Sequence, residues 1–124
     1  HVRAFCHLRE RFLDFVIART LSAAPADANG KRSEEDAEWH NVVGVVLAAN
    51  PGLPKAHRHA VELDYGMSDG QLKLQCRQAM LFYLIHQLRL DDVERSRPES
   101  CQVVLKNRKA LSAYLGPELA TAAA

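Results

Sequence analysis

Hydrophobic residues recur every three or four positions through the first segment of the chain, from about Val2 to Leu21. A period near 3.6 residues is typical of an amphipathic helix, so we predict a first helix over this segment. This apolar stripe is wider than one packing face needs, which would leave hydrophobic surface for a second contact. Its members are Phe5, Leu8, Phe12, Leu13, Phe15, Val16 and Ile17.

The helical pattern stops in the segment 23–32. Pro25 does not continue a helix, and Asn29-Gly30 is a dipeptide that favours turns. We predict an exposed, flexible loop here, because connecting segments of this kind run over the protein surface.

A second element begins at Ser33, a residue type that caps helix N-termini, and Glu34, Glu35 and Asp36 follow it. Carboxylates favour the positive end of a helix. We therefore predict a second helix that continues through residues 42–47. The valines of that run are β-branched, so a strand is the alternative there.

The longest predicted helix runs from about residue 69 to residue 90. Ser68 and Gln71 have the spacing of a capping box at its start. Residues 79–85 are apolar on every side of such a helix, which is typical of a buried element. We expect this helix to lie at the centre of the molecule, with largely inaccessible side chains at Met80, Tyr83, Leu84 and Leu88.

Two shorter helices complete the prediction. Pro54 and Gly66 delimit one of them, since proline fits the first helical position and glycine ends a helix. The other spans about residues 100–116, with an extended stretch over 101–105 as the alternative. Residues 117–124 form a tail.

These elements together predict an all-α fold, a compact bundle of four to five helices around the central helix at about 69–90. The chain has 124 residues, which suits a single domain. Because the first helical pattern is already under way at Val2, we expect residues 1–124 to be a fragment of a longer protein. The chain contains no run of about 18 apolar residues, so we predict no membrane-spanning helix.

The composition is that of an ordinary globular domain and narrows the function only by exclusion. Apolar residues make up 48% of the chain and charged residues 25%, which does not fit intrinsic disorder. The net charge is +1, with 16 basic and 15 acidic side chains. A dedicated nucleic-acid module usually carries a clear basic excess, so bulk charge gives no support for one.

The cysteines and histidines do not form a recognisable site. The cysteine count is three, which argues against a disulfide framework and for reduced thiols inside a cell, in the cytoplasm or nucleus. Cys6-His7 and the His57/His59 pair are the close pairs, and neither spacing puts two ligands on one helix face. We predict no metal site and no cofactor.

No spacing that carries catalysis occurs in the chain. The Gly-x-Ser-x-Gly elbow, the phosphate-binding glycine loops and the His-Glu-x-x-His motif are all absent. We therefore predict no catalytic residue and no enzyme activity.

The remaining function classes are interaction and nucleic-acid contact. Surplus hydrophobic surface on the first two helices favours a helical protein–protein interaction or oligomerisation domain of a larger regulatory or structural protein. Helical domains of viral regulatory or capsid proteins are an analogy at the level of the fold alone. The partner would be a second copy in a homodimer or another protein. Candidate interface residues are Phe5, Phe12, Val16, Trp39, Val42 and Val46.

The alternative function is a domain that contacts nucleic acid through two basic patches at 55–59 and 106–109. Such side chains bind phosphates, although a nearly neutral domain usually carries them as solvated surface. The candidate residues are Lys55, Arg58, Lys106, Arg108 and Lys109.

Overall fold

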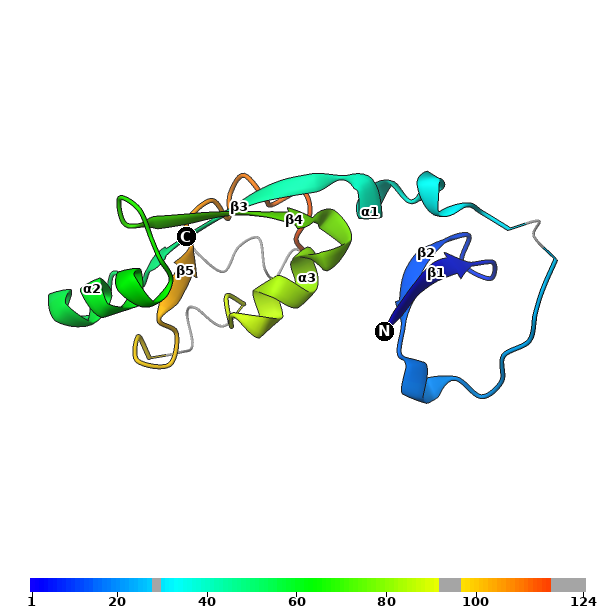
Figure 1. The fold of residues 1–124 in the computed structure, drawn as a ribbon, viewed down its shortest axis with the longest axis horizontal. Coiled ribbons are helices and arrows are strands. Elements are labelled where there is room, and N and C mark those ends of the chain that lie inside the picture. Colours follow the sequence, from blue (N-terminus) through cyan, green and yellow to red (C-terminus); the bar gives the residue numbers. More distant parts are fainter. Residues whose placement is uncertain (28–29, 92–96, 117–124) are drawn as a thin grey trace.

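The computed structural model describes residues 1–27, 30–91 and 97–116. It shows an α/β fold with two antiparallel sheets (Figure 1), so the predicted all-α bundle is wrong. The predicted tail at 117–124, and part of the predicted 23–32 loop, lie outside the described residues. The rest of that loop has no regular structure up to Ser33, and its side chains are exposed.

The predicted first helix is a β-hairpin. Strand β1 (Val2–Cys6) pairs with β2 (Arg11–Phe15), and Phe5 lies opposite Phe12. Their rings meet edge to face at 5.3 Å. Cross-strand aromatic pairs stabilise a sheet, and the aromatic and β-branched residues that suggested an apolar helix stripe also favour strands. A short 3₁₀ turn, Ile17–Arg19, follows the hairpin.

The second predicted helix is also mostly wrong. A 3₁₀ turn, Ser33–Glu35, leads into the single-turn helix α1 (Ala37–His40), whose first turn is capped by the Asp36 side chain accepting a bond from the Trp39 N–H. The valine run then forms strand β3 (Val42–Ala49). The strand alternative holds there because buried Val43, Val45 and Leu47 alternate with outward residues.

The predicted helix at 69–90 is a strand followed by a short helix. Strand β4 (Gln71–Arg77) pairs with β3 and turns its apolar residues Leu72, Leu74 and Cys76 toward the core. Helix α3 (Gln78–Gln87) begins directly after it. The alternation of apolar and polar residues over 72–77 is a period of two, which a strand requires and a helix does not satisfy.

Helix α2 (Lys55–Asp64) confirms the prediction of a short third helix. Pro54 is its N-cap residue, and the chain turns at Gly66 with a positive φ of 62°. Glycine adopts this left-handed conformation without steric cost.

Strand β5 (Val103–Leu105) replaces the predicted last helix and confirms the extended alternative there. It pairs with β3, which gives the sheet order β4-β3-β5. Beyond β5, the side chain of Asn107 continues the pairing: its oxygen accepts from the Val46 N–H, and its amide donates to the Gly44 carbonyl, both at 2.9 Å.

The core lies between this sheet and the two longer helices. Val61 of α2 and Leu81 and Ile85 of α3 are buried in one cluster with Val43, Val45 and Leu47 of β3. Both helices lie below β3 and β4 in Figure 1, and the hairpin lies to one side of them. The prediction of a buried central helix is therefore wrong in part: Met80 is 43% exposed, and Tyr83, Leu84 and Leu88 are only partly buried.

Candidate functional site

The outward surfaces of α2 and α3 differ in charge. The sequence of α2 is KAHRHAVELD, and its exposed residues include Lys55, His57 and His59. The sequence of α3 is QAMLFYLIHQ, which contains no Asp, Glu, Lys or Arg. Only one stripe of α3 faces the core, so hydrophobic side chains remain outside.

The uncovered hydrophobic side chains of α3 flank its buried stripe. Leu81 and Ile85 are at most 1% exposed, whereas Phe82 is 56% exposed and Met80 is 43% exposed. Successive helical residues point about 100° apart, which places Phe82 and Met80 on opposite flanks of the stripe. Each flank of α3 therefore exposes one large hydrophobic side chain.

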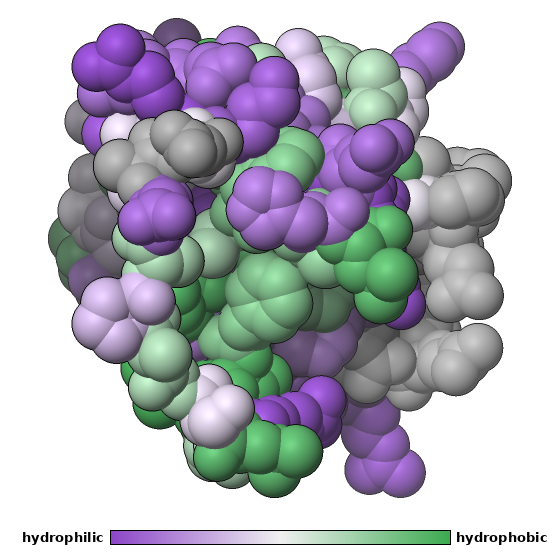
Figure 2. Space-filling model, turned by 90° about the vertical axis from the view of Figure 1, so that its right-hand side faces the viewer, coloured by the Kyte–Doolittle hydropathy of each residue, from purple (hydrophilic) through white to green (hydrophobic). Residues whose placement is uncertain are grey.

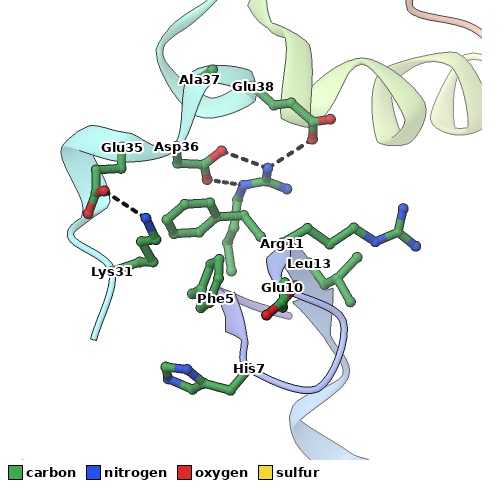
Figure 3. Close-up of a pocket in the computed structure, with 12 residues that line it drawn as sticks. Phe5, His7, Glu10, Arg11, Leu13, Lys31, Glu35, Asp36, Ala37 and Glu38 are labelled. Atoms are coloured by element: carbon green, nitrogen blue, oxygen red, sulfur yellow. Dashed lines mark hydrogen bonds and ion pairs between the residues drawn. The ribbon is translucent and has the colours of Figure 1, made fainter. Parts of the chain in front are cut away.

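The hairpin is attached to the rest of the molecule through Arg3. Its guanidinium donates to Asp36 at 2.9 Å, to Glu38 at 3.0 Å and to Asp14 at 3.2 Å. The bond with Asp36 raises the pKa of Arg3, and the same bond lowers the pKa of Asp36. Figure 3 shows Asp36 and Glu38 pointing at the guanidinium from α1 and the turn before it, while Arg11 extends away.

Helix α3 also contacts the hairpin. The hydroxyl of Tyr83 donates to the Asp14 carboxylate at 2.9 Å, and the ring of His1 lies 5.3 Å from the ring of Tyr83. Burial is the main cause of a raised pKa at Tyr83, and the bond with Asp14 adds to it. Asp14 thus accepts hydrogen bonds from both Arg3 and Tyr83 and joins the hairpin to α3.

A pocket of about 770 Å³ opens beside Arg3, between the hairpin and the segment 31–38 (Figure 3). Its charged residues are largely paired with one another: Arg3 with Asp36 and Glu38, and Lys31 with Glu35 at 3.2 Å. The backbone N–H of Arg32 is the main cause of a lowered pKa at Glu35. The ion pairs of Arg3 join the hairpin to the segment that precedes and forms α1.

Histidine and cysteine side chains do not converge in the described parts of the chain. Across 1–27, 30–91 and 97–116, no group of three or more His, Cys, Asp and Glu could hold a metal ion. Cys6, Cys76 and Cys101 form no disulfide in the described parts of the chain, and burial raises the pKa of the Cys76 thiol. No helix among these residues is long and apolar enough to cross a membrane.

The predicted interface residues lie on different elements. Phe5 and Phe12 pair across the hairpin, and half-buried Val16 follows it. Trp39 of α1 stacks under the guanidinium of Arg77 at 4.7 Å. Val42 and Val46 point to the outer face of β3, where Val42 is 53% exposed. Contact of these residues with a partner remains a prediction.

The predicted nucleic-acid residues also lie apart. Lys55 is exposed and Arg58 half-buried on α2, while Lys106 and Lys109 are exposed in the turns after β5. Arg108 is only 4% exposed and donates to the Leu90 carbonyl. Burial lowers the pKa of Arg108. The three exposed cations remain candidates for phosphate contact.

Sequence reasoning missed Phe82 as a surface residue. The assumption that an apolar helix is buried all round placed it in the core. The available signal was the end of the alternation at Arg77, which shortens the helix to Gln78–Gln87. A helix of that length packed on one sheet cannot be covered on all sides.

The exposed hydrophobic surface is not confined to α3. Figure 2, which looks at the end of the molecule that carries the hairpin, shows hydrophobic side chains at the surface between hydrophilic ones. In the hairpin and the segment after it, Val2, Phe15 and Ile17 are between 41% and 60% exposed.

Comparison with known proteins finds a family match for the region that contains α3. Residues 42–111 match the family described as "BrxR transcriptional regulator, C-terminal dimerization domain". This range runs from the start of β3 past β5 and includes both longer helices.

Curated relatives extend the similarity to nearly the whole chain. The chain is 40% identical over 93% of its length to the "DNA-binding transcriptional repressor CapW" of Escherichia coli (strain KTE188). Proteins of the same name are 42% identical over 87% of the chain in Pseudomonas aeruginosa and 38% identical over 93% in Stenotrophomonas maltophilia. The chain spans only 39%, 36% and 39% of the length of these three relatives.

Proposed function

This chain belongs to the family of BrxR transcriptional regulators, and from this premise we propose that it holds two copies of such a regulator together as a homodimer. The observation that carries the proposal is the match of residues 42–111 to a dimerization domain. The sheet β4-β3-β5, α2 and α3 all fall in this range and share one hydrophobic core. A two-fold dimer is the commonest closed assembly of identical chains.

The mass of the chain in solution tests this proposal. We expect a dimer at micromolar concentration in sedimentation equilibrium, with a mass unaffected by chelator or reductant. A mass that stays at 13.8 kDa, the value for one chain, over the whole concentration range would contradict it. Loss of the dimer with chelator would point to a metal, and loss with reductant to a disulfide.

The relatives of the chain support a role for the whole protein. We propose that the longer regulator is a DNA-binding transcriptional repressor acting in the cytoplasm, as the names of its relatives suggest, and that this chain has a regulatory role without enzyme activity. Dimers bind two half-sites of a symmetric operator. We expect a full-length regulator with a broken dimer contact to bind a palindromic operator far more weakly and a single half-site with unchanged affinity.

Direct nucleic-acid contact by this chain is the second candidate. Its support is the exposure of Lys55, Lys106 and Lys109, together with the DNA-binding relatives. Contact with phosphates makes affinity fall steeply with salt, with a slope that drops by about one for each lysine removed. An unchanged slope in the Lys55→Ala, Lys106→Ala and Lys109→Ala variants would contradict this candidate.

A further inference from the structure

Three aromatic side chains of α3 lie in contact with one another, with Phe82 and His86 exposed and Tyr83 partly buried against the hairpin. The ring of Phe82 stacks on the ring of His86, with centroids 5.2 Å apart and planes 20° apart. The ring of Tyr83 meets Phe82 edge to face at 5.6 Å. We call Phe82, Tyr83 and His86 the α3 ridge.

Aromatic residues are enriched at the energetic centres of protein interfaces, and charged residues are depleted there. The α3 ridge satisfies both conditions, because α3 carries no Asp, Glu, Lys or Arg along its length. Phe82 is its anchor candidate, since more than half of its surface is exposed in the single chain.

We propose that the α3 ridge, with Phe82 at its centre, is the surface through which two copies of this chain meet. The inference rests on the proposed function, since it names the face that a dimerization domain would use. The occupant is a second copy because α3 lies wholly inside residues 42–111, the part that matches the dimerization family.

Symmetry supports the choice of this face. In a two-fold dimer the same surface of both copies meets itself, so any net charge on the surface opposes a like charge. Helix α3 brings no Asp, Glu, Lys or Arg of its own into such a contact, and the carboxylate of Asp91 beside the ridge is already paired with Nδ1 of His86 at 2.5 Å. Two aromatic ridges can interlock without desolvating an unpaired ion.

The outer face of the sheet is less suited to self-association. Lys73 and Arg77 of β4 point to it beside Gln71, Gln75 and the small or β-branched residues of β3. No carboxylate occurs on the strand positions that share this face. Two copies meeting there would bring like charges together, which disfavours association.

The surface of α2 is unsuitable for a different reason. Lys55, His59 and Glu62 give it a mixed, solvated character. It nevertheless carries Leu63, which is 68% exposed. Leu63 is therefore a matched control for Phe82: each is an exposed hydrophobic residue on a helix of ten residues packed on the same core.

The experiment compares Phe82→Asp with Leu63→Asp by sedimentation equilibrium of the intact chain. We expect Phe82→Asp to raise the dimer dissociation constant at least about 30-fold, as removal of an interface anchor does. We expect Leu63→Asp to leave it within about twofold. Circular dichroism and thermal unfolding establish that each variant folds. If Phe82→Asp does not fold, Phe82→Ala replaces it, because alanine keeps the helix propensity high.

The outcomes separate this inference from the proposed function. A monomeric wild-type chain overturns both. A wild-type dimer whose dissociation constant is unchanged by a folded Phe82 variant overturns the α3 ridge and leaves dimerization standing. Equal weakening by Phe82→Asp and Leu63→Asp also overturns it, because the effect would then belong to added charge and not to the ridge.

Discussion

Helices α2 and α3 have the same length and pack against the same core, but their outward surfaces differ. In α2 the buried contact is Val61, and the rest of the helix is mostly charged or imidazole-bearing. In α3 the buried contacts are Leu81 and Ile85, and the rest is apolar or amide-bearing apart from His86, which pairs with Asp91. Burial against the core therefore does not account for the composition of α3.

The difference teaches how to interpret an apolar helix in a small domain. A helix that is hydrophobic all round is covered all round in its functional state, and this sheet covers only one side of α3. The uncovered side is consistent with a contact that a single chain does not contain. The charged exterior of α2, by contrast, is that of a helix whose outer side stays in water.

The largest expected effect is on the buried side of α3. Ile85 is fully buried, so Ile85→Ala should lower the free energy of unfolding by about 2–5 kcal/mol through lost burial and a cavity. Val61→Ala in α2 removes fewer atoms and should cost about 1–3 kcal/mol. Urea unfolding measures both losses. A smaller loss for Ile85→Ala than for Val61→Ala would contradict the prediction that the buried side of α3 contributes more to stability than that of α2.

The next effect concerns how the melting temperature depends on protein concentration when the outer side of α3 is changed. A dimer makes the melting temperature rise with protein concentration, and a partner at 100 times its dissociation constant adds about 2.7 kcal/mol. We expect the wild-type and Leu63→Asp chains to show this dependence and Phe82→Asp to lose it. Thermal scans over a hundredfold dilution series provide the measurement, and a concentration-independent wild type would argue against a dimer.

A third effect concerns the hairpin, which is held by hydrogen bonds to Asp36, to Glu38 of α1 and to Tyr83 of α3. The pKa of Asp36 is lowered by Arg3, so this contact stabilises the attachment above the ordinary aspartate pKa of about 3.9 and is lost as pH falls through the lowered value.

Hydrogen exchange of the β1 and β2 amides at several pH values tests this attachment. Protection should be retained from neutral pH to about pH 5 and decline below pH 4. Asp36→Asn should weaken it at neutral pH, because a neutral amide cannot pair with the Arg3 guanidinium as a carboxylate does. Equal protection in Asp36→Asn and wild type would remove Arg3 and Asp36 from the attachment.

The smallest effect is expected at the outer side of α2. Leu63→Asp changes a side chain that is 68% exposed, so the free energy of unfolding should change by less than about 0.5 kcal/mol. A loss above about 2 kcal/mol in urea unfolding would show that the outer side of α2 is covered in solution and would remove the contrast with α3.

The sequence predicts α2 correctly because its signals are local. Pro54 and Gly66 determine both ends through their own backbone preferences. The strand β4 could also be predicted, since Leu72, Leu74 and Cys76 alternate with Lys73, Gln75 and Arg77. That period of two was hidden by the capping signal at Ser68 and the apolar run that follows.

The hairpin is harder to predict because its stabilising contacts are not local. Phe5 and Phe12 fit one helix stripe by spacing and one cross-strand pair by register. Arg3 finds Asp36 and Glu38 more than thirty residues along the chain. Spacing alone does not distinguish a helix from a hairpin here. Spacing also does not predict the exposure of Phe82, because that exposure depends on where β4 ends.

The most direct test of the α3 ridge is the solvent exposure of Phe82 in the assembled protein. The chain contains four phenylalanines, so labelling with 4-fluorophenylalanine gives few fluorine resonances, and a Phe82→Leu sample assigns the one of interest. We predict that a soluble paramagnetic agent broadens the Phe82 signal weakly at dimer concentrations and strongly after dilution, while partly exposed Phe15 is broadened at both. Equal, strong broadening of Phe82 in a sample that sediments as a dimer would contradict the account.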